Sequence, residues 1–473
     1  MPSSSSSAKT SSSRTGASPN ELGSRPIGKL LVQYSLPAII ASLVTSLYNI
    51  VDSIFIGRGV GAMAISGLAI TFPLMNLVVA FCVLISAGGS TISSIFLGQK
   101  NIDKATDTVN NVMLMCLVHA AVIGSLCFIF LDEILCFFGA TEETLPYARD
   151  FMQVILLGTP ISYVFIGLNN LMRATGYPAK AMVSAILSVV VNVVLAPLFI
   201  FKFGWGIRGA ATATIIGQLS AFVWVMAHFL SKKSAVRLQW HRTWFSPRLL
   251  QRIYGIGMSP FLMNCCACLV VVFINKSLLD AAGADGNTAI GAYGIINRTT
   301  MFFIMVIFGI TQGMQPILGY NYGAGNWKRV KGTLGRGIWI GAAISTLGCV
   351  GCELLPDSIS HMFTDDGPMV KIAREGFRAY FIGFPVVGVQ IVIQNYFQSL
   401  GKPKLSIFLS LTRQLLFLVP LLWLLGRLYG IYGVWYSMAL SDLLAGLLAI
   451  GTILYMNPRL ERQINSTSYD TED

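Results

Sequence analysis

Long apolar runs separated by short polar segments dominate the chain from about residue 30 onward. A helix needs about 20 apolar residues to cross the hydrocarbon core of a bilayer, and the runs reach that length. Twelve runs recur, with approximate limits 30–56, 64–98, 107–131, 146–171, 180–201, 208–230, 250–280, 288–321, 332–355, 371–399, 405–426 and 432–456. The pattern predicts an all-α integral membrane protein with twelve transmembrane helices.

Composition agrees with a membrane protein and argues against a large soluble one. Of the 473 residues, 54% are hydrophobic and 11% are charged, whereas soluble domains carry roughly 25% charged residues. The net charge is +12, but the basic residues lie between apolar runs rather than in one patch, so the lipid bilayer is the expected partner and nucleic acid is not. The Ser-rich start has no apolar segment after Met1, which favours a disordered tail over a cleavable signal peptide.

Basic residues are concentrated in alternate loops. Loops rich in Lys and Arg usually stay in the cytoplasm. Such loops contain Lys100, Arg173, Lys232, Arg329 and Lys402, while the loops between them are acidic. The distribution predicts a multi-pass protein with both termini in the cytoplasm, which agrees with an even number of spans.

The second half of the chain repeats the first. Gly98 and Asn101 correspond to Gly323 and Asn326, 225 residues later, and with a slightly smaller offset Pro37 falls on Pro260. Each half has six spans and begins on the same side, so the repeats are parallel. The predicted divisions are a disordered tail (1–24), a first lobe (25–230), a basic cytoplasmic linker (231–249), a second lobe (250–457) and a cytoplasmic tail (458–473).

Asp52 is the only acid in the first apolar run. A carboxylate at membrane depth costs about 2.5–3.5 kcal/mol, so such a residue is a candidate functional site. The alternative is a hydrated residue near the helix end. Pro37 interrupts the same run, and we expect it and Pro260 to act as hinges because proline removes a backbone hydrogen bond. The repeat places Asn275 at the position of Asp52, so only the first lobe carries this acid.

Polar residues of the first lobe are candidate partners for Asp52. A buried carboxylate can exchange a proton, or it can hold a cation such as Na⁺ with additional oxygen ligands. Candidate ligands are Asn49, Asn192, Thr212 and Thr214. Asn192 can instead hydrogen-bond between helices, and the threonines can bond to their own backbone. Both interpretations stay open for Asn192.

Several polar or flexible side chains are candidates for lining a substrate cavity. Gln312 and Gln315 replace Ala87 and Ser90 of the first half. We also include Asn170, Asn275 and Met172, although methionine is a common filler in membrane helices.

The remaining motifs indicate no catalytic centre. The sequence has no His-Glu-x-x-His, no Gly-x-Ser-x-Gly and no phosphate-binding loop, so we expect a protein that is not an enzyme and uses an ion gradient rather than ATP. Arg413 and Asp442 are expected to pair as a structural contact.

Three segments resemble the multidrug and toxic compound extrusion (MATE) transporters. They are 51–58 (VDSIFIGR), 170–178 (NLMRATGYP) and 206–214 (GIRGAATAT). The resemblance covers about residues 25–457 and implies two six-helix bundles in a V shape, with export of drugs coupled to inward flow of Na⁺ or H⁺. The family's first-lobe cation site uses residues that match Asp52, Asn192 and Thr214.

The chain is similar to the DinF-like branch of that family, which lacks second-lobe acids. That branch has an acid four residues after the asparagine, and here the position is Ala196, which favours H⁺ over Na⁺. We therefore expect a monomeric antiporter of a bacterial inner membrane that exports cationic or amphipathic drug-like molecules without a cofactor. The alternatives are a lipid-linked oligosaccharide flippase of the same superfamily and a non-transporting membrane scaffold.

Overall fold

The computed structural model describes residues 21–232, 234–239 and 245–469, and this part of the chain is almost entirely helical. The helices are α1 (Glu21–Ser24), α2 (Ile27–Gly59), α3 (Ala62–Gly98), α4 (Ile102–Ile129), α5 (Leu131–Phe137), α6 (Leu145–Leu157), α7 (Thr159–Ala174), α8 (Pro178–Pro197), α9 (Gly206–Leu230), α10 (Pro247–Ala282), α11 (Gly286–Gly323), α12 (Trp327–Leu354), α13 (Pro356–His361), α14 (Gly367–Phe381), α15 (Phe384–Ser399), α16 (Pro403–Leu411) and α17 (Val419–Tyr469). Two π-helical segments, Leu198–Lys202 and Thr412–Leu418, follow α8 and α16.

Twelve membrane spans can be traced in the described residues. Nine helical segments are long and apolar enough to cross a bilayer, and two more spans are bent pairs: α6 with α7, at 57°, and α14 with α15, at 54°. The longest segment, Pro403–Arg462, runs through Gly430, whose backbone is not helical (φ 58°, ψ −138°) and divides it into two spans. The predicted all-α twelve-span architecture is confirmed.

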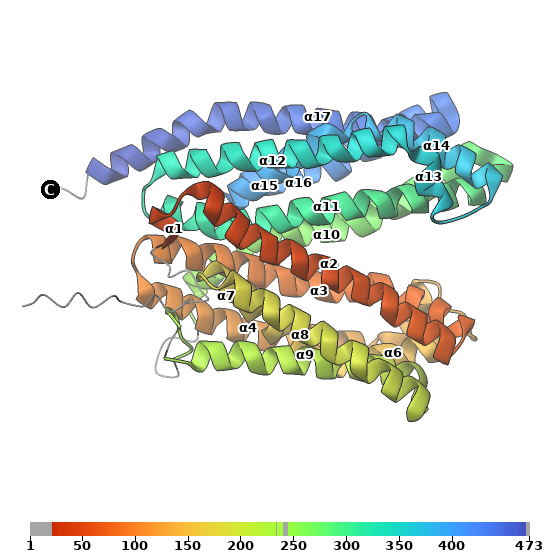
Figure 1. Cartoon of the computed structure of the whole chain (residues 1–473), viewed down its shortest axis with the longest axis horizontal. Helices are drawn as coiled ribbons and strands as arrows, with labels where there is room; N and C mark the ends of the chain where they lie inside the picture. The colour runs from red at the N-terminus through yellow and green to blue at the C-terminus, as the bar shows by residue number, and fades with distance from the viewer. Residues whose placement is uncertain (1–20, 233, 240–244, 470–473) are drawn as a thin grey trace, which may run out of the picture.

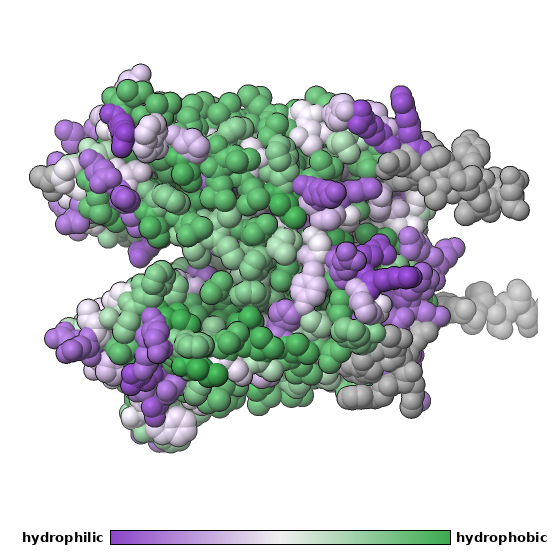
Figure 2. All heavy atoms as spheres, turned by 180° about the vertical axis from the view of Figure 1, so that it is seen from behind, coloured by the Kyte–Doolittle hydropathy of each residue, from purple (hydrophilic) through white to green (hydrophobic). Residues whose placement is uncertain are grey.

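The helices form two halves with a hollow between them. Helices α3 to α9 lie together on one side and α10 to α17 on the other, with α2 between them (Figure 1). The hollow separates the halves at one end of the molecule (Figure 2). We call this the open end. The opposite end, where α1 begins and α17 ends, is the terminal end, and there the halves are in contact.

At both ends of the chain, helices extend into segments that were predicted to be tails. Residues 21–24, predicted as disordered, form α1, because the carbonyl of Leu22 accepts hydrogen bonds from Asn321 Nδ2 (3.1 Å) and Arg329 Nη2 (3.0 Å). Helix α17 continues past residue 457 to Tyr469. Residues 1–20 and 470–473, and residues 233 and 240–244 of the predicted linker, lie outside the described residues.

A reciprocal crossing joins α3 and α11 near the terminal end. A Cβ atom on Gly98 would lie 2.0 Å from the carbonyl oxygen of Tyr320, and one on Gly323 would lie 2.1 Å from that of Ile95. Gly98 and Gly323 are equivalent in the repeat, and so are Ile95 and Tyr320. Each half therefore makes the same contact with the other. Glycine allows this approach because any side chain would collide with backbone.

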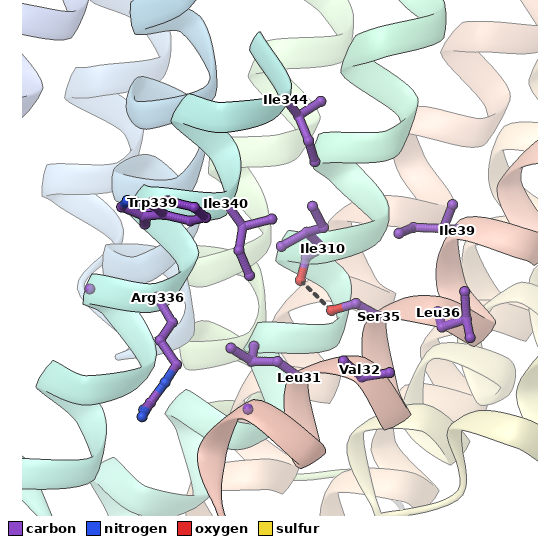
Figure 3. A pocket seen from close by; sticks show the side chains of 12 residues that line it. Leu31, Val32, Ser35, Leu36, Ile39, Ile310, Arg336, Trp339, Ile340 and Ile344 are labelled. Atoms are coloured by element: carbon purple, nitrogen blue, oxygen red, sulfur yellow. Dashed lines mark hydrogen bonds between the residues drawn. The ribbon is translucent and has the colours of Figure 1, made fainter. Parts of the chain in front are cut away.

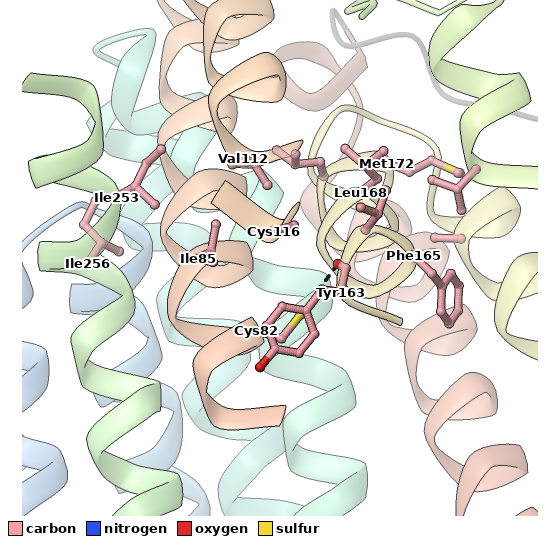
Figure 4. Close-up of a cluster of buried hydrophobic side chains, with 14 of the residues drawn as sticks. Cys82, Ile85, Val112, Cys116, Tyr163, Phe165, Leu168, Met172, Ile253 and Ile256 are labelled. Atoms are coloured by element: carbon pink, nitrogen blue, oxygen red, sulfur yellow. Dashed lines mark hydrogen bonds between the residues drawn. The ribbon is translucent and has the colours of Figure 1, made fainter. Parts of the chain in front are cut away.

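The first helix of each half also packs against the other half. Positions Gly309 and Gly313 of α11 bring that helix against Ile39 and Ser35 of α2. Gly257 of α10 likewise approaches α3, and Ile253 and Ile256 of α10 face Ile85 in a buried cluster of side chains (Figure 4). Helices α2 and α10 thus connect the two halves.

Both candidate hinge prolines lie inside unbroken helices. Pro37 is within α2 and Pro260 within α10. A polar side chain near each proline makes a hydrogen bond: Ser35 Oγ donates to Ile310 O of α11 (3.3 Å), and Asn264 Nδ2 donates to Pro260 O of its own helix (2.7 Å). A hinge role for either proline stays a prediction.

Candidate functional site

A cavity of about 360 Å³ lies in the first half, next to α11 of the second. This is within the range of about 300–1,000 Å³ typical of small-ligand sites. Its polar lining comes from α2, α7, α8, α9 and α11 and includes Tyr48, Asn169, Asn170, Arg173, Asn192, Thr214, Gln218 and Gln312. Four of the predicted site residues, Asn170, Asn192, Thr214 and Gln312, are therefore together in one cavity.

The hydroxyl group of Thr214 joins three helices at the wall of this cavity. It accepts a hydrogen bond from Asn192 Nδ2 (2.9 Å) and lies 3.0 Å from the hydroxyl of Tyr48. Thr214 Oγ1 itself donates to Ala210 O (3.1 Å). A threonine hydroxyl has one proton to donate, so Tyr48 is the donor in its contact with Thr214. These bonds connect α2, α8 and α9.

Asp52 lies one helical turn beyond Tyr48, toward the open end. Its side chain is 7% exposed, and Oδ1 is buried without a hydrogen-bond partner among the described residues. Burying a charged oxygen without a partner is costly, so such a group calls for an explanation. The burial favours a functional Asp52 over a hydrated residue at the helix end.

Ala196 occupies the position at which the DinF-like pattern has a second acid. Helices α2 and α8 run in the same direction. Asp52 follows Tyr48 by four residues and Ala196 follows Asn192 by four, and both Tyr48 and Asn192 are hydrogen-bonded to Thr214. Ala196 is completely buried. A carboxylate here would lie at the level of Asp52, so its replacement by a methyl group leaves Asp52 without a second acid from α8.

Arg173 links the cavity to the second half of the molecule. The sequence suggested a cytoplasmic loop, but the structure places Arg173 in the last turn of α7, where Nη1 donates to Gln312 Oε1 of α11. The sequence signal was its spacing, because Arg173 follows Asn169 and Asn170 by four and three residues and shares their helix face. Tyr48 was missed too, although it precedes Asp52 by one turn.

The repeated organisation of the chain agrees with a comparison with known families. The MatE family model matches residues 37–198 and again 257–424, one segment in each half. The chain belongs to the MatE family. The resemblance to MATE transporters is confirmed, and this MatE protein is a membrane transporter rather than an enzyme.

Relatives and solved structures of this MatE protein extend over most of its length. It is 27% identical to the multidrug export protein MepA of Staphylococcus haemolyticus, over 92% of this chain and 95% of that one, and 26% identical to MepA of Staphylococcus aureus with the same coverage. The fold is similar to a MATE crystal structure in the bent conformation (TM-score 0.89, 21% identity, 95% and 99% of the two chains). It is also similar to an outward-facing multidrug resistance MATE transporter (TM-score 0.87, 21% identity, 93% and 98%).

Other predicted site residues of this MatE protein lie outside the hydrogen-bonded group of Tyr48, Asn192 and Thr214. Asn49 is one residue past Tyr48 on another face of α2 and is exposed. Thr212 Oγ1 donates to Arg208 O (2.7 Å) of its own helix, as the alternative for the threonines proposed. Met172 is completely buried in the core that Figure 4 shows.

Two predicted cavity residues of the second half do not line this cavity. Gln315 Nε2 donates to Ser90 Oγ (3.1 Å) and Thr91 Oγ1 (2.7 Å), so it joins α11 to α3. Asn275 lies in α10, where Oδ1 is buried without a partner among the described residues.

The predicted pair of Arg413 and Asp442 is confirmed within the second half. Arg413 Nε donates to Asp442 Oδ1 (2.7 Å), and the two side chains are 19% and 6% exposed. Arg413 lies on the π-helical segment Thr412–Leu418, and its carbonyl accepts a bond from Ser441 Oγ (2.7 Å).

Proposed function

We propose that this MatE transporter is a secondary active antiporter that exports amphipathic small molecules in exchange for inward-moving protons. The relatives named multidrug export proteins support export of drug-like molecules. The observation that carries the proposal is the buried Asp52, one turn from the Tyr48 hydroxyl that shares Thr214 with Asn192.

Binding of a proton to Asp52 would change the energetics of α2. The charged carboxylate is costly in its buried position, and the protonated form is not. Helix α2 contacts Thr214 of the first half through Tyr48. It contacts α11 of the second half through Ser35 and Ile39. An ion drives a conformational change only if it binds the two states with different affinity. A change of charge at Asp52 can meet that condition, because a shift of α2 alters the contact between the halves.

The ligands around Asp52 support protons rather than Na⁺. A sodium site needs several oxygen atoms around the ion. The DinF-like pattern places an acid in α8, but in this chain that position is the buried Ala196. The amide group of Asn192 is engaged as a donor to Thr214. One carboxylate is sufficient to carry a proton.

The cavity lining supports an amphipathic substrate. Phe165, Ile166 and Met305 offer apolar contact, and Arg173 is the only charged residue among the described lining residues. A positive charge on a substrate would be repelled by Arg173, so we propose that a cationic drug directs its charge away from this residue.

A single arginine in the cavity supports small-molecule export over flipping of a lipid-linked oligosaccharide. The diphosphate of such a lipid would require several cations. The placement of basic turns at the terminal end supports an orientation with that end in the cytoplasm. We also propose that the transporter works as a monomer in a bacterial inner membrane.

The decisive experiment is dye efflux from proteoliposomes with H⁺ and Na⁺ gradients imposed separately. We expect efflux under the proton gradient, and we expect Asp52→Asn to abolish it while dye binding in detergent is retained, because the cavity contacts are unchanged. Asp365→Asn is the matched control, since Asp365 is fully exposed. Adding Asn275→Asp should not rescue the variant. Normal proton-driven efflux by Asp52→Asn would refute the proposed coupling.

A further inference from the structure

A second hollow of the molecule lies on its membrane-facing side, between α2 of the first half and α11 and α12 of the second. It has a volume of about 650 Å³. Its walls are Leu31, Val32, Leu36 and Ile39 on one side and Ile310, Trp339, Ile340 and Ile344 on the other (Figure 3). We call it the lateral groove. It does not share a residue with the cavity around Thr214.

The lateral groove is open to the surroundings and apolar along its length. Val32, Leu36 and Trp339 are 63%, 52% and 75% exposed. The one hydroxyl in the wall, that of Ser35, donates to the carbonyl of Ile310, so the lining is apolar apart from Arg336 at one end and the indole N–H of Trp339. A hollow of this kind in a membrane protein would be filled by a hydrocarbon chain.

Two glycines widen the groove near its terminal end. A Cβ atom on Gly28 or on Gly335 would meet no other atom within 4 Å. These glycines are therefore not needed for close packing of helices, in contrast to Gly309 and Gly313 on the floor side, where α2 lies against α11. Their effect is to leave space for another molecule.

Arg336 provides a positive charge at the same end. It lies nine residues into α12, roughly 14 Å from the helix start, and its side chain extends away from Trp339 and Ile344 toward the Leu31 end (Figure 3). Its hydrogen bond is to Gly332 O of its own helix (3.4 Å), and it has no acidic partner among the described residues. Neighbouring Arg329 is engaged with the backbone of Leu22 and Arg25.

We propose that the lateral groove binds one anionic glycerophospholipid, with an acyl chain between α2 and α12 and the phosphate at Arg336. Contact with apolar walls gives no selectivity in a bilayer, because lipid tails are as apolar as the side chains. The selectivity comes from the guanidinium group, which bonds phosphate oxygens with two donors. Basic sites between helices at the cytoplasmic surface are suited to anionic head groups.

The bound lipid would stabilise the state in which the terminal end is closed. The groove is built from both halves, and its two walls separate when α2 moves away from α11 and α12. A ligand that contacts both walls favours the state in which they are close.

The test is native mass spectrometry of the full-length protein, equilibrated with equal amounts of phosphatidylglycerol and phosphatidylcholine that carry the same acyl chains. We expect the wild-type protein to retain the anionic lipid roughly tenfold more than the zwitterionic one. Arg336→Gln should remove this preference. Gly335→Leu should fill the groove and reduce retention of both lipids.

Gly351→Leu is the matched control, because Gly351 lies on the same helix, also has open space around its Cβ position and is outside the groove. It should retain lipid like the wild-type protein. Equal retention of the two lipids by wild type, or an unchanged preference in Arg336→Gln, would show annular lipid only and would overturn the proposal. Arg336 is exposed, so its variant keeps the test decisive even if Gly335→Leu does not fold.

Discussion

Gln315 donates a hydrogen bond to Ser90, the residue that occupies its own position in the first half of the repeat, 225 residues earlier. Two residues related by a two-fold axis can touch only beside that axis. The contact therefore marks where the pseudo-two-fold axis passes between α3 and α11. Because the donor is a glutamine and the acceptor a serine, this hydrogen bond has no symmetric counterpart across the axis.

Removing this bond should weaken contact between the halves. We expect Gln315→Ala to shift the conformational equilibrium at least roughly fivefold away from the closed terminal end, because it loses the hydrogen bonds to Ser90 and Thr91, worth about 0.5–1.5 kcal/mol each. The measurement is the distance distribution between spin labels on the exposed Lys104 and Lys328. Gln218→Ala, which breaks a bond to Ser162 within the first half, should leave the distribution unchanged. Identical distributions for Gln315→Ala and wild type would contradict the prediction.

Asn192→Ala should weaken coupling without preventing insertion. The change removes one donor from Thr214 while the Tyr48 contact is retained. We expect roughly a fivefold fall in gradient-driven efflux, on the scale of one lost hydrogen bond. Thr212→Ala is a suitable control, since that hydroxyl bonds to its own helix. If Asn192→Ala transports with wild-type ion dependence, Asn192 serves packing alone.

Ala196→Asp should introduce or increase dependence on Na⁺. The new carboxylate would lie at the level of Asp52, one turn from Asn192 on the same face of α8. Two carboxylates and nearby hydroxyls form a better cation site than one. Efflux is measured against external Na⁺ at constant pH, with Ala196→Asn as a variant of equal size and no charge. An unchanged Na⁺ response in folded Ala196→Asp would count against this arrangement of α2 and α8.

Breaking the pair of Arg413 and Asp442 should reduce stability more than removing it entirely. Either single change, Arg413→Met or Asp442→Leu, leaves a buried charge without a partner, which costs about 3–5 kcal/mol. The double variant leaves no charge and should recover most of the loss. Melting temperatures in detergent test this order, and proton-driven efflux by the double variant would show that the pair is structural. A double variant that melts below both single variants would contradict the interpretation.

The apolar runs were sufficient for the twelve spans, because a bilayer imposes length and hydrophobicity on each helix separately, and the matching residues about 225 positions apart were sufficient for the duplicated halves. The apolar runs did not reveal the bends at Gly158 and Gly383, since each half of a bent span is as apolar as a straight one. Contacts between distant residues were also out of reach. Arg173 was taken for a loop residue because its partner, Gln312, is 139 residues away.

The cluster around Thr214 was predicted only in part. The resemblance to MATE transporters indicated Asp52, Asn192 and Thr214, and the structure joins Asn192 to Thr214. Tyr48 was not selected, because tyrosine is common in membrane helices and nothing in its sequence position identifies the side chain that it contacts. Asn49 was selected for its chemistry, but the helix turns it onto an exposed face.

The reciprocal glycines at the crossing of α3 and α11 place a steric limit on the transport cycle. When the terminal end is closed, the backbone at Gly98 and Gly323 is in contact with a carbonyl group of the opposite half. A single added methyl group at either position would act as a wedge and hold the halves apart at this end. The missing side chains are therefore required less for folding either half than for letting the two halves close against each other at the terminal end.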